Sequence, residues 1–88
     1  MNPKKRTGLN EKIIGRECYI TTMDGSSLTV LNPTALLIWS LCDGEHSMSE
    51  IQAILAELYP DQAADRLQTD MERSLDDFRA RGLLEHIT

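Results

Sequence analysis

The sequence lacks the features that mark several classes of protein. No apolar run approaches the roughly 20 residues that a membrane-spanning helix needs, so no membrane segment is expected. Residues 7–12 are polar where a signal peptide would carry its apolar stretch, and we therefore expect a cytoplasmic location. Lys and Arg number 9 against 14 Asp and Glu, which gives a net charge of -5. Because nucleic-acid affinity depends on neutralising phosphates, a nucleic-acid partner is not expected.

The chain also lacks a recognisable catalytic or metal-binding constellation. Cys18 and Cys42 are too far apart for a CxxC motif, and no cluster of His and Cys has the spacing of metal ligands. Both cysteines are expected to be free, buried thiols. Asp76 and Asp77 are adjacent on a predicted helix and do not face each other, so they do not form a catalytic pair. We expect no enzymatic activity, no metal and no cofactor.

Residues 13–31 have the composition of a β-hairpin. Two runs rich in β-branched and aromatic residues flank Asp24-Gly25, a pair typical of a tight turn. Pairing across this turn predicts two faces of a sheet. One face carries Tyr19, Thr21, Met23, Leu28 and Val30. The other carries Cys18, Ile20, Thr22, Thr29 and Leu31. A short additional strand is predicted around residues 12–15.

A short, apolar helix is predicted directly after the hairpin. Asn32 is a favoured N-cap, and Pro33 suits the first helical position, where a missing N–H has no consequence. We expect this helix to end near Cys42, before Asp43-Gly44. It has almost no polar face, which indicates that it is covered on most sides and occupies the centre of the domain.

Two further helices are predicted. Ser47 and Glu50 form a capping box that begins the second helix, which Pro60 ends. The third lies within residues 61–81 and is closed by Gly82. Its apolar stripe is expected to consist of Leu67, Met71, Leu75 and Phe78. Leu83, Leu84 and Ile87 are expected to return to the core or to add a short strand.

These elements predict an α+β fold resembling a winged helix-turn-helix, with a small antiparallel sheet of two or three strands followed by three helices. We expect a flexible lead-in at residues 1–12 and a single domain at residues 13–88. The strand at residues 27–31 is a candidate sheet edge, because it lacks the Pro, Lys and Glu that usually guard edges. An open edge can accept an extended peptide by β-augmentation, or a second copy of the chain as a homodimer. Alternatively, the N-terminal segment covers this strand.

Two other functions remain open at this point. A winged-helix regulator would place its third helix in the DNA major groove, but residues 61–81 contain six acidic and four basic side chains. This charge disfavours binding to DNA. The chain could also be a structural subunit that contacts an enzyme through the apolar face of its hairpin.

One longer motif resembles a known family. The run LNPTALLIWSLCDG at residues 31–44, followed by Ile51 and by Gly82-Leu83-Leu84, is similar to the PqqD family over residues 10–86. Pro33 departs from the pattern, because many relatives have an acidic or polar residue there. It is expected only to strengthen the start of the helix.

The resemblance implies a domain that binds the leader region of a ribosomally made precursor peptide and presents it to a modifying enzyme. In the quinone-cofactor pathway that enzyme is a radical-SAM protein. The peptide would add as a strand beside the third strand and against the third helix. In this sequence, the resemblance implies that the edge consists of Ser27, Leu28, Thr29, Val30 and Leu31. The groove wall is the expected exposed margin of Met71, Ser74, Leu75 and Phe78.

Overall fold

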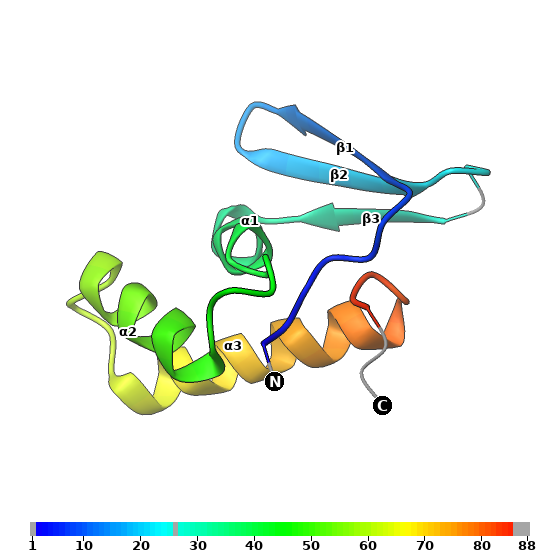
Figure 1. Ribbon diagram of the computed structural model, residues 1–88. Coiled ribbons are helices and arrows are strands. Elements are labelled where there is room, and N and C mark those ends of the chain that lie inside the picture. Colours follow the sequence, from blue (N-terminus) through cyan, green and yellow to red (C-terminus); the bar gives the residue numbers. More distant parts are fainter. Residues whose placement is uncertain (1, 26, 86–88) are drawn as a thin grey trace.

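The computed structural model describes residues 2–25 and 27–85 and contains three strands followed by three helices (Figure 1). The strands are β1 (Leu9–Ile14), β2 (Glu17–Thr22) and β3 (Leu28–Leu31). The helices are α1 (Pro33–Ser40), α2 (Met48–Leu58) and α3 (Ala64–Ala80). The predicted α+β order is therefore confirmed. β1 begins earlier than the strand expected at residues 12–15, and the predicted domain boundary at residue 12 falls inside it.

The three strands form one antiparallel sheet in the order β1-β2-β3. Cys18 lies opposite Leu31, and Ile20 lies opposite Thr29, so the predicted pairing of β2 with β3 is confirmed. These four side chains are buried on the inner face. Gly25 takes a positive φ of 72° in the turn between β2 and β3, a conformation that glycine adopts without strain.

α1 lies at the centre of the packing, as its sequence predicts. The Asn32 side chain caps it by accepting a hydrogen bond from the backbone N–H of Ala35 at 2.8 Å. The helix ends at Ser40, slightly before the expected Cys42. Trp39 is fully buried and meets Phe78 of α3 edge to face, with ring centroids 5.2 Å apart. This contact fixes α1 against α3.

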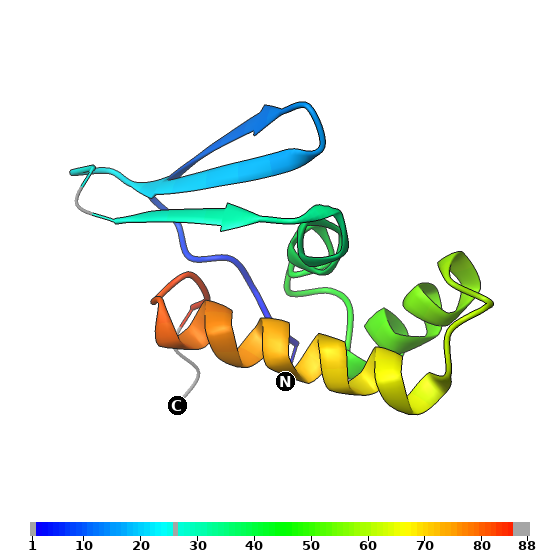
Figure 2. The same ribbon diagram turned by 180° about the vertical axis from the view of Figure 1, so that it is seen from behind.

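α2 and α3 complete the helical layer. The capping box of Ser47 and Glu50 is present, with both reciprocal hydrogen bonds. The predicted apolar stripe of α3 is confirmed: Leu67, Met71, Leu75 and Phe78 are buried. α3 runs below the sheet in both ribbon views, and β3 is the strand on its side (Figures 1 and 2).

The residues after α3 return to the core. Leu83 and Leu84 are buried, and the backbone N–H of Leu83 donates to the Phe78 carbonyl at 2.8 Å. Ile87, which was also expected in the core, lies outside the described residues. Within residues 2–25 and 27–85, no helix has the length and apolar character needed to cross a membrane.

The segment before β1 runs between the α1–α2 connection and the described residues that follow α3 (Figure 1). Lys5 donates its backbone N–H to the Cys42 carbonyl at 2.9 Å, and Arg6 donates to Leu83 at 2.8 Å. The carbonyl of Lys4 accepts from Glu85 at 2.8 Å. In the described part of the chain, no backbone hydrogen bond joins residues 3–6 to β3. The N-terminal segment is thus bonded elsewhere and does not pair with the edge of β3.

Candidate functional site

β3 is an edge strand, because β2 is its one neighbour in the sheet. The backbone N–H of Thr22 donates to the Ser27 carbonyl at 3.2 Å, one position beyond the last pair of the ladder, in which Thr21 lies opposite Leu28. Hydrogen-bonded and non-hydrogen-bonded pairs alternate along an antiparallel ladder. It follows that Thr29 and Leu31 direct their backbone groups toward β2.

The same alternation directs the backbone groups of Leu28 and Val30 away from β2, toward the open edge. Outside the ladder itself, no backbone hydrogen bond within residues 2–25 and 27–85 reaches these groups. The side chains of Leu28 and Val30 are also 58% and 46% exposed, on the outer face of the sheet. The edge therefore offers two outward N–H groups and two outward carbonyls, flanked by apolar side chains.

A pocket lies between the start of α1 and the middle of α3, just beyond the C-terminal end of β3. It has a volume of about 270 Å³. Its lining residues are Asn32, Thr34, Ala35, Asp70, Arg73 and Ser74. Asp70 and Arg73 bring opposite charges to its rim, and neither takes part in an ion pair within the described residues. The pocket can accept polar side chains.

A second pocket, of about 450 Å³, lies at the opposite end of the sheet. It is bounded by residues 6–9 of the N-terminal segment and by residues 22–24 at the end of β2 and the start of the following turn. The two pockets therefore border different ends of the hairpin, one near each end of β3.

The structure separates the residues predicted to form the groove wall. Ser74 is half-buried and lines the first pocket. Met71, Leu75 and Phe78 are at most 2% exposed and belong to the core. The expectation of an exposed margin is wrong for these three, because they pack against the other core side chains. Their contact with a peptide stays a prediction.

Sequence reasoning missed the other lining residues of the first pocket. Asp70 and Arg73 lie on the same helix as Ser74, and Asp70 is one turn before it, so helical spacing alone could have placed them together. Thr34 and Ala35 come from α1, and nothing in the sequence shows that its first turn faces the middle of α3. Packing of the two helices creates this part of the site.

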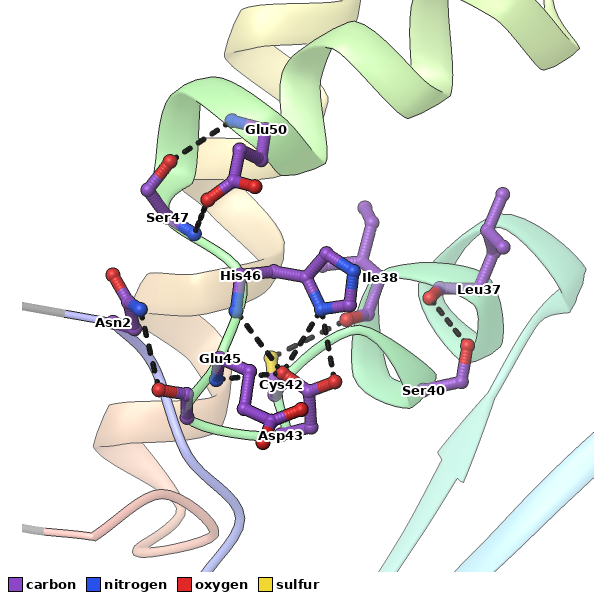
Figure 3. A network of polar contacts seen from close by, with 11 residues as sticks. Asn2, Leu37, Ile38, Ser40, Cys42, Asp43, Glu45, His46, Ser47 and Glu50 are labelled. Atoms are coloured by element: carbon purple, nitrogen blue, oxygen red, sulfur yellow. Dashed lines mark hydrogen bonds and ion pairs between the residues drawn. The ribbon is translucent and has the colours of Figure 1, made fainter.

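The polar network in the α1–α2 connection is structural (Figure 3). His46 Nδ1 lies 2.9 Å from both carboxylate oxygens of Asp43. Asp43 also accepts hydrogen bonds from the backbone N–H groups of Glu45 and His46. The side-chain bond to His46 and the backbone bond to Glu45 lower the pKa of Asp43 to about 2, and the bond to Asp43 raises the pKa of His46. The network orders the connection that precedes the capping box of α2.

Cys18 and Cys42 are free and buried, as predicted. Burial raises the pKa of both thiols, that of Cys42 to about 11, so both stay protonated near neutral pH. Within the described residues, no three His, Cys, Asp or Glu side chains gather as metal ligands.

Comparison with known proteins places this geometry in a family. The family model described as "Coenzyme PQQ synthesis protein D (PqqD)" matches residues 17–84. The chain belongs to the PqqD family. The PqqD match includes the edge strand β3 and the whole of α3, whereas β1 precedes it. Among curated proteins, none matches this PqqD-family chain.

A solved structure has the same fold as this PqqD-family chain. It is that of TbiB1 in complex with the TbiA(beta) leader peptide, with a TM-score of 0.82 at 19% sequence identity. The alignment covers 97% of this chain and 98% of TbiB1. The similarity therefore extends over the complete fold, including β1 and the segment before it.

Proposed function

We propose that this PqqD-family chain binds the leader region of a precursor peptide as an additional strand on β3. The observation that carries the proposal is the pair of unbonded backbone segments at Leu28 and Val30. Two residues with outward backbone groups can form a short ladder with an extended peptide. The structural similarity to TbiB1, which was solved with a leader peptide, supports this choice of ligand.

The surfaces beside β3 would determine which peptide sequences bind. Side chains on the outer face of the guest strand would extend the apolar surface of Leu28 and Val30. Side chains on the inner face would lie toward α3, where Ser74 and Arg73 line the pocket beyond the end of β3. Thr29 and Leu31, together with Ser27 just before the strand, hold β3 against β2.

The chain acts without catalysis of its own and presents the bound peptide to a modifying enzyme. Membership of the PqqD family supports a partner in quinone-cofactor or modified-peptide biosynthesis, with a radical-SAM protein as the expected enzyme in the former. The site of action is the cytoplasm. A homodimer that paired two β3 edges would compete with the leader, because both would use the same backbone groups.

DNA binding is the alternative function, and the charges of α3 disfavour it. Arg79 pairs with Asp76 at 3.2 Å, and Arg81 pairs with Asp77 at 3.0 Å. These carboxylates compete with phosphates for two of the arginines in this region.

A titration of the labelled, full-length chain distinguishes the two functions. The ligands are synthetic N-terminal segments of short reading frames next to the gene, scrambled versions of the same segments, and duplex DNA at moderate salt. We expect one native segment to bind and to shift the amide signals of residues 27–31, while its scrambled version and DNA do not. Shifts produced by DNA alone would contradict the proposal.

A further inference from the structure

The hydroxyl of Thr29 is buried without a hydrogen-bond partner among the described residues. Thr29 is 3% exposed on the inner face of β3, and among the described residues it is the polar member of an otherwise apolar core. Its Oγ1 atom has no hydrogen-bond partner among the described residues. Burying a hydroxyl without a partner destabilises a fold, and valine has nearly the same shape and an equally high strand propensity. The hydroxyl therefore lowers the stability of the free chain, and no contact within the described residues compensates for it.

The ladder pattern places Thr29 beside a guest strand. Its backbone groups point to β2, so an antiparallel guest on the open edge would meet Thr29 in a non-hydrogen-bonded pair. In such pairs the opposite Cα atoms are about 4.5 Å apart, and the side chains are at their closest. Directly opposite residues also project to the same face. The guest side chain opposite Thr29 would thus lie against it, on the side of the sheet that faces the helices.

We propose that Thr29 is a specificity-determining residue that selects Ser or Thr at the opposite position of the leader. The inference rests on the function proposed above. Hydroxyl pairs form hydrogen bonds across antiparallel strands, and a short hydroxyl side chain fits the close spacing of this pair. An apolar peptide side chain opposite Thr29 would bury the Thr29 hydroxyl without a hydrogen-bond partner. A charged peptide side chain there would itself be buried without a counter-ion. The unpaired hydroxyl would then be satisfied only in the complex.

Peptide selection tests this inference without knowledge of the natural leader. A display library of random short peptides is selected separately against the full-length parent, Thr29→Val and Thr29→Ser. We expect the parent and Thr29→Ser to enrich Ser and Thr at one peptide position, and Thr29→Val to enrich Val and Ile there. Thr21→Val is the matched control. It makes the same chemical change on the neighbouring strand β2, but on the outer face of the sheet. It should keep the parental preference.

A double-mutant cycle measures the contact directly. The tightest peptide from the parental selection is expected to bind Thr29→Val about fivefold more weakly. Replacing its Ser or Thr by Ala should remove most of that difference, because the two changes disrupt one interaction. Thr29→Val should also have a higher urea midpoint than the parent, which separates the loss of affinity from unfolding. The effect of the Ala substitution in the peptide is also measured on the parent chain, so that measurement does not depend on how Thr29→Val folds.

Two outcomes count against the inference in different ways. Identical residue preferences for the parent and Thr29→Val would overturn the role of Thr29 and leave the proposed function in place. A parental selection that yields no peptide able to shift the amide signals of β3 would contradict the proposed function, and the inference with it.

Discussion

The indole N–H of Trp39 donates a hydrogen bond to the Glu11 carboxylate at 2.8 Å, which joins the buried helix α1 to strand β1. Lys5 Nζ lies 3.5 Å from the same carboxylate oxygen and 5.0 Å from the centroid of the Trp39 ring. One buried aromatic side chain therefore connects α1, β1 and the N-terminal segment. Through Phe78 it also contacts α3.

Glu11→Ala should destabilise the chain through Trp39 rather than through lost charge. The substitution leaves a buried indole donor without an acceptor, which costs about 1–3 kcal/mol of the free energy of unfolding. Urea denaturation measures the change. Glu17→Ala, an exposed substitution on β2, is the control and should stay within about 0.5 kcal/mol of the parent. Equal losses for both variants would show that the Trp39 contact is unimportant.

Trp39→Ala should lower the free energy of unfolding by about 3–5 kcal/mol, because it removes the largest side chain of the core. Peptide binding would then be lost only as far as the chain unfolds. Thermal and urea denaturation test this, with Leu58→Ala as an exposed counterpart on α2. Denaturation midpoints equal to those of the parent would refute the central position assigned to α1.

The Asp43–His46 contact predicts a dependence of stability on pH. The pKa of His46 is raised above 6.5, so the contact stabilises the fold below that pH and is lost as pH rises through the raised value. The pKa of Asp43 falls from 3.8 to about 2, so its contribution is present above 3.8 and is lost as pH falls through about 2. The urea midpoint of the parent should decrease as pH rises from near 6 to near 8. His46→Gln should show a smaller decrease, and the same decrease in both would exclude this contact as the cause.

Much of the fold follows from short-range signals in the sequence. Asp24-Gly25 sets the turn and thereby the register of β2 with β3, and Asn32-Pro33 and the capping box of Ser47 and Glu50 set the starts of two helices. Each signal acts within a few residues, so it can be recognised without knowing the tertiary structure. The absence of Pro, Lys and Glu from residues 27–31 is another short-range feature, and it predicts that β3 is a candidate edge.

The rest depends on contacts between distant segments. The N-terminal segment is held by backbone hydrogen bonds to Cys42 and Leu83, and backbone groups leave no trace in the choice of side chains. The spacing of Met71, Leu75 and Phe78 shows that they share a face of α3, but not how completely other elements cover that face. The pocket beside Ser74 likewise needs α1 and α3 to be packed before its residues meet.

Val30→Pro tests whether a peptide pairs with the edge of β3, because it removes one backbone N–H group. Proline removes the N–H that Val30 directs outward, and edge strands tolerate proline where that N–H faces away from the sheet. We expect a folded chain, shown by circular dichroism, with peptide binding weakened by about threefold to tenfold through the loss of one hydrogen bond. Val30→Ala keeps the N–H and should bind more tightly than Val30→Pro. Equal affinities of the two variants would exclude a backbone contact at this residue.

Amide hydrogen exchange at β3, with and without a bound leader peptide, tests the central claim most directly. In the free chain the amides of Leu28 and Val30 should exchange rapidly, whereas those of Thr29 and Leu31, bonded to β2, should be protected. A saturating leader should slow exchange at Leu28 and Val30 and leave the alternate residues nearly unchanged. Saturation with the leader that leaves Leu28 and Val30 exchanging as in the free chain would contradict strand addition at this edge.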